Sequence, residues 1–243
     1  MRHPTDGTDF SSNLDRHALA HQDPHRPELG SLPDAPSVDE DIVEQLKTGT
    51  TTVGIATDDG VVLATDQQAS IGRMISNKNV QKVEPIHPTG AITIAGSVSA
   101  AQSLVRTLKA EVNLYEARRG EHMSMQALST LMSNLLRSGA FLIVSPILGG
   151  VDSEGSHVYS IDPLGSTLKD DFTVSGSGSQ FALGVLEQEY DDSLSTEEAR
   201  VVAARAVQSA TERDVSSGYG CHVAEITDEG VEVDEYDDIA DAL

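Results

Sequence analysis

Hydrophobic and polar positions begin to alternate regularly only near residue 50 of the chain. Two short runs there place an apolar residue at every second position, and Asp58-Asp59-Gly60 separates them. An Asp-Gly pair between two such runs is a strong signal for a β-hairpin, because glycine readily adopts the positive φ of the turn. The pattern therefore predicts two paired strands around residues 53–55 and 61–63.

The apolar period changes to three and four residues over 98–115, which is typical of an amphipathic helix. Two arginines and a glycine at 118–120 are suited to end this helix, because cations and a positive-φ glycine both favour a helix C-terminus. A second helix should follow the N-cap Ser124. A third should begin after the glycine- and serine-rich segment 175–179, and a fourth after the capping box at 195–198.

Further strands are expected near residues 91–96, 141–148, 157–161, 223 and 231. The elements thus follow the order strands, two helices, strands, two helices, strands. A doubly wound parallel sheet would instead alternate strand and helix throughout. The order predicts an α+β fold or a layered sandwich.

The first 49 residues differ in composition from the rest of the chain. They hold 5 of the 9 prolines, and their mixture of Asp, Ser, Pro and His cannot bury enough apolar surface to offset the entropy of ordering. His17, His21 and His25 recur every four residues, which is the spacing of metal ligands on one helix face. Prolines interrupt any such helix. We therefore expect a disordered leader.

The net charge of the chain excludes some classes of binding partner. It has 39 acidic and 16 basic residues, a formal net charge of −23. Nucleic acids and anionic membranes are both bound through basic patches, so neither is an expected partner. Dispersed acid with little lysine fits a protein that works in concentrated salt, where screening weakens self-repulsion.

The expected location is the cytoplasm. The chain has no apolar run approaching the roughly 18 residues of a membrane span, and its start lacks the apolar core of a signal peptide. The single cysteine, Cys221, excludes an internal disulfide, and its neighbours indicate a buried strand thiol rather than a nucleophile.

Several familiar catalytic motifs are missing from the sequence. The segment 175–179 is not followed by the Gly-Lys-Ser/Thr of a P-loop, and neither G-x-S-x-G nor H-E-x-x-H occurs. The histidines outside the leader, His87, His122, His157 and His222, are scattered along the chain. We therefore expect neither a metal centre nor a cofactor.

The junction at Gly49 and Thr50 is the most informative part of the sequence. A polar leader ends there, directly before the threonine that begins the regular region. Cleavage between the two residues would give Thr50 a free α-amine with a pKa of about 8, a suitable base for its own hydroxyl. Glycine leaves room for that hydroxyl to attack the preceding carbonyl. Three consecutive threonines are also a good strand start, so these residues alone leave both interpretations open.

Motifs further along the chain favour the catalytic interpretation. Over residues 50–227 the sequence resembles the proteasome β subunits, N-terminal-threonine proteases of the N-terminal-nucleophile hydrolase group, and most of all the archaeal form. The resemblance rests on GTTTVG (49–54), ATD (64–66), NKNVQK (77–82), ITIAG (92–96), GGVD (149–152), SGSG (175–178) and RDVSSG (213–218). Each motif alone is weak, but their order and spacing are specific. Together with the acidic composition, the resemblance implies a haloarchaeal source.

The resemblance implies catalytic roles for three residues. Thr50 would be the nucleophile, and the Lys82 ammonium beside it would lower the pKa of the Thr50 amine and hydroxyl. Asp66 would pair with Lys82 and orient it. By themselves, Lys82 and Asp66 would be an ordinary solvated lysine and a carboxylate at a hairpin end.

The resemblance also implies supporting roles for residues beyond this group. Ser177, Asp214 and Ser217 would form a hydrogen-bonded cluster around the Thr50 amine. The backbone N–H of Gly96 would bind the oxyanion of the tetrahedral intermediate. Without the resemblance, these would be loop residues and the acid at the end of a helix.

Substrate is expected to lie extended beside Ala69 and Ser70 and the segment near Gly96, paired through main-chain hydrogen bonds. Ile94 and Val98 would line an apolar specificity pocket that holds no charge. Cleavage after hydrophobic or aromatic residues, the chymotrypsin-like pattern, is the resulting expectation. Ordinary core packing is the alternative role for Ile94 and Val98.

The resemblance implies a four-layer αββα sandwich with two regions: a propeptide (1–49) removed by autocleavage and a threonine peptidase domain (50–243). It also implies seven-membered rings of this chain stacked between rings of α subunits, with regulatory ATPase rings supplying unfolded proteins. Two alternatives are a catalytically silent ring-assembly subunit and another enzyme of the group, such as a two-ring bacterial-type protease or a small amidase. An acidic binding module without a ring is a third.

Overall fold

The computed structural model describes residues 49–71, 74–141 and 143–243. The expected disorder of the leader and the histidine spacing within it concern residues outside this part of the chain. Within it, two five-stranded antiparallel sheets have the orders β10-β1-β2-β11-β12 and β5-β6-β7-β8-β9, and β3 pairs with β4 separately.

The first sheet is formed by β1 (Thr51–Ala56), β2 (Val61–Asp66), β10 (Phe172–Gly176), β11 (Cys221–Thr227) and β12 (Gly230–Tyr236). The second sheet is formed by β5 (Val83–His87), β6 (Gly90–Thr93), β7 (Ile147–Asp152), β8 (Gly155–Ile161) and β9 (Thr167–Asp170). The separate pair is β3 (Ala69–Ile71) and β4 (Met74–Asn77). The helices are α3 (Val98–Arg119), α4 (Met125–Arg137), α5 (Ser179–Glu189), α6 (Thr196–Thr211) and the 3₁₀ helix η1 (Ile239–Ala242).

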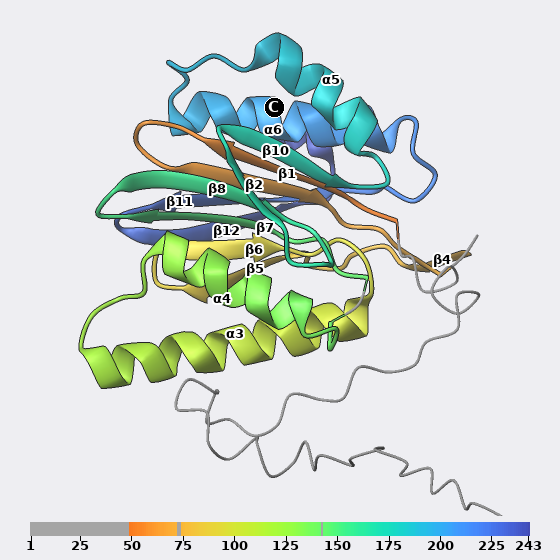
Figure 1. Cartoon of the computed structure of the whole chain (residues 1–243). Helices are drawn as coiled ribbons and strands as arrows, with labels where there is room; N and C mark the ends of the chain where they lie inside the picture. The colour runs from red at the N-terminus through yellow and green to blue at the C-terminus, as the bar shows by residue number, and fades with distance from the viewer. Residues whose placement is uncertain (1–48, 72–73, 142) are drawn as a thin grey trace, which may run out of the picture. The chain divides into compact units, whose positions relative to one another are not determined.

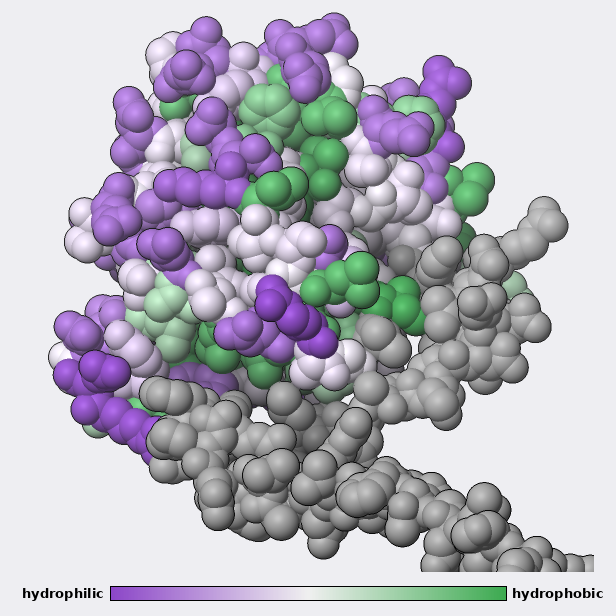
Figure 2. All heavy atoms as spheres, viewed as in Figure 1, coloured by the Kyte–Doolittle hydropathy of each residue, from purple (hydrophilic) through white to green (hydrophobic). Residues whose placement is uncertain are grey.

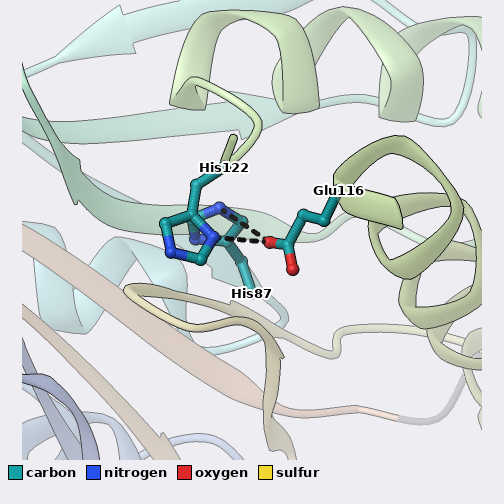
Figure 3. A group of neighbouring side chains, drawn as sticks. All are labelled: His87, Glu116 and His122. Atoms are coloured by element: carbon teal, nitrogen blue, oxygen red, sulfur yellow. Dashed lines mark hydrogen bonds and ion pairs between the residues drawn. The ribbon is translucent and has the colours of Figure 1, made fainter. Parts of the chain in front are cut away.

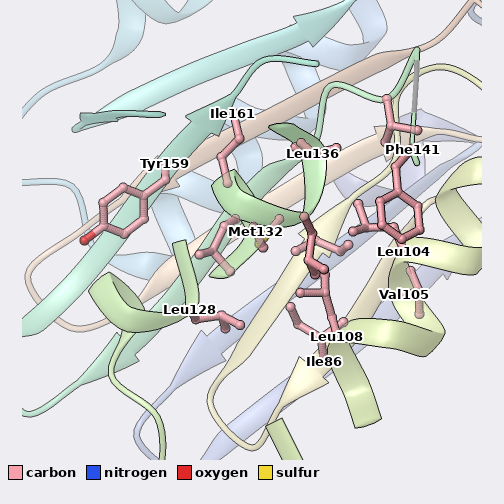
Figure 4. Close-up of a cluster of buried hydrophobic side chains, with 14 of the residues drawn as sticks. Ile86, Leu104, Val105, Leu108, Leu128, Met132, Leu136, Phe141, Tyr159 and Ile161 are labelled. Atoms are coloured by element: carbon pink, nitrogen blue, oxygen red, sulfur yellow. The ribbon is translucent and has the colours of Figure 1, made fainter. Parts of the chain in front are cut away.

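The sheets pack face to face, with α5 and α6 covering the first sheet and α3 and α4 covering the second (Figure 1). Three buried clusters correspond to the three gaps between these layers. Leu63 and Ile147 lie between the two sheets. Val53 of the first sheet and Ala203 of α6 belong to the cluster between that sheet and its helices. Leu104 lies between α3 and the second sheet (Figure 4). The expected α+β fold and four-layer αββα sandwich are therefore confirmed.

The hairpin predicted around Gly60 is confirmed, but the reason for its glycine is different. β1 and β2 pair in antiparallel register, with Ile55 opposite Val62. Gly60 does not adopt a positive φ. A Cβ there would instead lie 2.7 Å from the Ile226 carbonyl oxygen and 2.9 Å from Thr196 Oγ1, so close packing requires the glycine.

The predicted helix signals are confirmed at the ends of three helices. Gly120 ends α3 with a φ of 71°, the left-handed conformation that favours glycine. The Ser124 hydroxyl accepts a hydrogen bond from the Ala127 N–H at the start of α4. Ser195 and Glu198 form the predicted capping box of α6.

The strand predicted at 141–148 is wrong in position, because β7 begins only at Ile147. Ile143 has a φ of 66°, which is not a strand conformation, and Val144 forms only an isolated bridge with Gly96. The apolar residue Phe141 instead joins the buried cluster under α3 and α4. The segment is apolar because it is buried, although its backbone does not form a strand.

No described helix is long and apolar enough to cross a membrane. Hydrophilic side chains cover much of the face in the space-filling view (Figure 2). Cys221 is free and fully buried in β11, as its neighbours predicted, and burial raises the pKa of its thiol to about 12. A thiol in this state is a poor nucleophile.

Candidate active site

Three residues from adjacent strand ends meet at one edge of the sandwich. Thr50 directly precedes β1, Asp66 is the last residue of β2, and Lys82 directly precedes β5. Thr50 is 2% exposed, Lys82 5% and Asp66 0%. A buried hydroxyl, ammonium and carboxylate are costly to desolvate unless they pair with one another.

The three side chains do pair. The Thr50 hydroxyl donates a hydrogen bond to Asp66 Oδ1 (2.8 Å), and Lys82 Nζ donates to the same oxygen (2.8 Å). Lys82 Nζ is also hydrogen-bonded to Thr50 Oγ1. The ammonium therefore sits against both the candidate nucleophile and the carboxylate that the sequence associated with it.

Backbone amides hold the Asp66 carboxylate in place. Its Oδ1 accepts from the Thr51 N–H (2.9 Å), and its Oδ2 accepts from the N–H groups of Gln68 and Gly218 (3.0 Å each). These bonds fix the orientation of the carboxylate independently of Lys82. Gln68 and Gly218 were not singled out from the sequence, since a backbone donor leaves no side-chain signal.

Burial lowers the pKa of Lys82, and the negative charge of Asp66 only partly offsets this effect. Loss of water disfavours the charged ammonium, while the nearby carboxylate favours it. A lysine with a lowered pKa can take up the hydroxyl proton as a neutral amine. The resulting ammonium can then stabilise the developing alkoxide. Lys82 is thus suited to activate Thr50 Oγ1.

A second hydrogen-bonded cluster lies at the backbone nitrogen of Thr50. The Thr50 N–H donates to Ser177 Oγ (3.1 Å), and the Ser177 hydroxyl donates to Asp214 Oδ2 (2.5 Å). The Ser217 hydroxyl donates to the same Asp214 oxygen (2.7 Å) and lies 2.7 Å from Thr51 Oγ1. The three residues expected here therefore meet, and Asp214 and Ser217 reach Thr50 through Ser177 and Thr51.

Gly49, on the other side of the expected cleavage site, lies against these loops. A Cβ at this position would fall 1.8 Å from Ser216 Cβ and 2.8 Å from Ser177 Oγ. Such contacts are far shorter than any packed side chain tolerates. Glycine before Thr50 is therefore required by the close packing around it.

The backbone at Gly96 is held firmly next to the same pocket. Gly96 has a φ of 110°, and a Cβ there would lie 1.8 Å from the Ile143 carbonyl oxygen. Hydrogen bonds from Ser97 N to Ile143 O and from Ser145 N to Ala95 O (3.0 Å each) fix the segment on both sides. A fixed backbone suits a preorganised oxyanion donor, and that role remains a prediction.

A pocket opens beside Thr50, between the β3 strand and the start of α3. Its lining is Gly49, Thr50, Gln68, Ala69, Val80, Gln81, Lys82, Glu84, Ile94, Gly96, Val98 and Gln102. Ile94 and Val98, expected in the specificity pocket, line it together with Ala69, which was expected beside the extended substrate. Ser70 is buried and accepts a hydrogen bond from the Gln68 side chain (2.9 Å).

The expectation that this pocket holds no charge is wrong. Glu84, a residue of β5, also lines the pocket, and its carboxylate accepts from Lys109 Nζ of α3 at 3.2 Å. Sequence reasoning missed both residues because they are far apart in the chain and neither belongs to a motif. The pocket is therefore apolar on the side of Ile94 and Val98 and carries an ion pair at Glu84.

The histidines are also less scattered than their sequence positions indicate. His87 and His122 lie together with Glu116, so that their potential ligand atoms are all within 4.8 Å of one another. His157 instead pairs with Asp152 (2.9 Å). The absence of a metal-ligating group, inferred from spacing along the chain, is therefore not supported in three dimensions.

Comparison with known proteins places the chain in a family. The family model described as "Proteasome subunit" matches residues 46–226. A proteasome subunit beta of Haloquadratum walsbyi is 59% identical over 244 residues, covering 100% of this chain and 98% of the relative. One of Haloferax volcanii is 60% identical, covering 97% of each chain, and one of Halorubrum lacusprofundi is 66% identical, covering 82% of each.

The family model spans most of the chain, and each of these relatives aligns along most of its own length. The resemblance to β subunits of halophilic archaea, expected from the motifs and the acidic composition, is confirmed. The chain belongs to the proteasome subunit family.

Proposed function

We propose that this chain is the catalytic β subunit of a proteasome core particle, a threonine endopeptidase whose residues 1–49 are a removable propeptide. The observation that carries the proposal is the contact of the Thr50 hydroxyl with both Lys82 and Asp66 in a buried site. The similarity to relatives named proteasome subunit beta supports the same role.

The first reaction is removal of the propeptide by Thr50 itself. While the Gly49–Thr50 bond is intact, the Thr50 nitrogen is an amide and cannot act as a base. The neutral amine form of Lys82, which burial favours by lowering the Lys82 pKa, then takes the hydroxyl proton as Oγ attacks the Gly49 carbonyl carbon. The C–N bond breaks, and the Thr50 nitrogen takes up a proton to become a free α-amine. Water then hydrolyses the ester between Gly49 and Thr50 Oγ, which releases the propeptide that ends in Gly49.

Cleavage of a substrate peptide follows the same route with the α-amine available. Thr50 Oγ attacks the substrate carbonyl, the Gly96 N–H stabilises the oxyanion, and the leaving amine departs with a proton. Water, deprotonated by the Thr50 amine, then hydrolyses the acyl-enzyme. The cluster of Ser177, Asp214 and Ser217 orients that amine, since Ser177 already contacts the Thr50 nitrogen. These steps need no metal or cofactor.

The proposed assembly is a stack in which seven-membered rings of this chain lie between rings of α subunits in the cytoplasm. Regulatory ATPase rings would deliver unfolded proteins through the α rings, so that many bonds are cut before release. A catalytically silent ring subunit would not need the Thr50–Lys82–Asp66 contacts. Those contacts favour the active subunit, and the β-subunit relatives disfavour a bacterial-type two-ring protease or an amidase.

The decisive test is the N-terminus of the chain after assembly with its α partner. Intact-mass and N-terminal analysis should give a start at Thr50, with residues 1–49 absent. The reason is that only this cut creates the amine on which peptide hydrolysis depends. A particle that retains Met1, or starts at another residue, while showing full peptidase activity would refute the mechanism.

The pocket supports preferential cleavage after hydrophobic residues. Lys109 neutralises Glu84, which leaves the apolar surface of Ile94 and Val98 to select the substrate side chain. Fluorogenic peptides with Leu or Phe before the cut should be hydrolysed at least about tenfold faster than those with Arg or Glu. Lys109→Met should raise the relative rate for Arg, because it leaves Glu84 without its cation.

The matched control is the double variant Glu84→Gln with Lys109→Met, which removes both charges. It should restore the hydrophobic preference, because the unpaired charge of Glu84 is then gone. Faster cleavage after Arg or Glu by the unmodified particle would contradict the proposed specificity. An unchanged preference in Lys109→Met would contradict the role given to the ion pair.

A further inference from the structure

Three side chains that the proposed peptidase chemistry does not use lie together near the C-terminal end of α3 (Figure 3). His87 is the last residue of β5, Glu116 belongs to α3, and His122 lies in the connection between α3 and α4. His122 Nδ1 is 2.8 Å from Glu116 Oε1, and His87 Nε2 is 3.9 Å from the same oxygen. None of the three lines the pocket beside Thr50.

His87 shows that this group is more than a surface contact. Its side chain is only 2% exposed, and its Nε2 makes no hydrogen bond of good geometry among the described residues, although the Met123 backbone interacts with the ring. A buried polar atom without a partner is costly, and such atoms in folded proteins call for an explanation. Nε2 is directed toward Glu116 and His122, so a ligand held between them would satisfy it (Figure 3).

The charge state of His87 also suits a ligand. Burial is the largest effect on the pKa of His87 and lowers it, which favours the neutral imidazole. Neutral imidazole is the form that binds metal ions. Glu116 adds one negative charge to the group, and His122 adds a second imidazole that reaches solvent, with its side chain 68% exposed.

We propose that His87, Glu116 and His122 bind one divalent metal ion of the zinc type. Two imidazole nitrogens and one carboxylate oxygen form a known zinc ligand set that leaves a fourth position for water. The same set disfavours Mg²⁺ and Ca²⁺, which prefer ligand shells made of oxygen alone. The exposed side of His122 provides the path of entry for the ion.

Binding requires small adjustments of the two more exposed ligands. Metal–ligand bonds of about 2.1 Å in a tetrahedron place ligand atoms about 3.4 Å apart. The 2.8 Å contact between His122 and Glu116 must therefore open, and the 3.9 Å gap between His87 and Glu116 must close. Both changes fall within the rotation of side chains that are not fully buried, while His87 stays fixed.

The ring of His87 must also carry its proton on Nδ1 when Nε2 binds the ion. Thr89 Oγ1 lies 3.3 Å from Nδ1 and gives its own proton to the Val151 carbonyl (2.7 Å), so it can accept from Nδ1. The Thr89 backbone N–H, 3.1 Å from the same nitrogen, favours the other tautomer. This competition lowers the affinity, and we expect binding in the micromolar range and not tighter.

The experiment is equilibrium dialysis of the purified full chain against Zn²⁺, with bound metal counted per chain. Glu116→Gln and His122→Ala are the test variants, because both side chains are partly exposed. Glu121→Gln, an exposed acid next to His122, is the matched control. Leader histidines contribute equally to every sample, so the difference between variants reports this site alone.

The unmodified chain and Glu121→Gln should bind one more Zn²⁺ than either test variant, or bind that ion at least tenfold more tightly. Co²⁺ in place of Zn²⁺ should give visible absorption bands of a four-coordinate site, which the test variants lose. A hundredfold excess of Mg²⁺ should not displace the ion. Equal stoichiometry and affinity in all four proteins would overturn the proposal, whatever their peptidase activity.

Discussion

Replacing Lys82 by methionine should leave residues 1–49 attached and lower peptide hydrolysis by at least about a thousandfold. Lys82 Nζ is the amino nitrogen that contacts both Thr50 Oγ1 and Asp66 Oδ1. Methionine fills similar volume but neither takes up the hydroxyl proton nor stabilises the alkoxide. Mass analysis of the assembled particle and fluorogenic peptide turnover measure the two losses separately.

Two further variants show whether the proton or the charge of Lys82 matters. Lys82→Arg keeps a positive charge, but a guanidinium does not deprotonate in proteins, so it should fail to restore propeptide removal. Lys78→Met is the matched control, because Lys78 is an exposed lysine that lies over the Tyr219 ring. Normal processing in Lys82→Met would contradict the mechanism, and normal processing in Lys82→Arg would reduce Lys82 to an electrostatic role.

The pairing of Thr50 with Asp66 follows largely from the predicted hairpin. In the observed register Thr52 lies opposite Thr65, so Thr51 and Asp66 are neighbours across the strand ends. A two-strand pattern with a short turn fixes that register, because a slip by one residue would exchange the side chains that face the helices with those that face the second sheet. The hairpin pattern alone therefore predicts that Thr50 and Asp66 lie close together, even if the resemblance to a family is set aside.

The remaining site residues reach Thr50 through long-range packing, which local patterns do not encode. Lys82 precedes a strand of the second sheet, and Ser177 and Asp214 come from loops on either side of α5 and α6. Only the resemblance to a family indicated these three. Glu84 and Lys109 belong to no motif, and no sequence signal pointed to their ion pair in the pocket.

The histidine cluster also depends on long-range packing, which the sequence pattern does not reveal. His87, Glu116 and His122 are separated by a strand, a long helix and a turn, so their spacing in the sequence matches no ligand pattern. The helical period of 98–115 did predict where α3 would lie and where it would end. It could not predict that its last turns pack beside the end of β5, because that depends on how the layers stack.

Replacing Thr50 by alanine should abolish activity, with turnover at least about 10⁴-fold lower and residues 1–49 retained. The change removes Thr50 Oγ1, the hydroxyl oxygen that contacts both Lys82 and Asp66. The backbone hydrogen bond from the Thr50 nitrogen to Ser177 should survive, so the fold and the assembly should persist. Intact mass, peptide turnover and particle size by chromatography in high salt test the three statements.

Thr50→Ser and Thr52→Ser separate loss of the nucleophile from general damage to β1. Thr50→Ser keeps both a hydroxyl and, after cleavage, an α-amine, so it should process the chain and retain measurable turnover. Thr52 lies two residues further along β1, where its hydroxyl contacts the Ser175 carbonyl, and Thr52→Ser should behave as the unmodified chain. If particles built only from Thr50→Ala lose the propeptide and cut peptides normally, the nucleophile must be another residue, because alanine has no oxygen with which to form the acyl-enzyme.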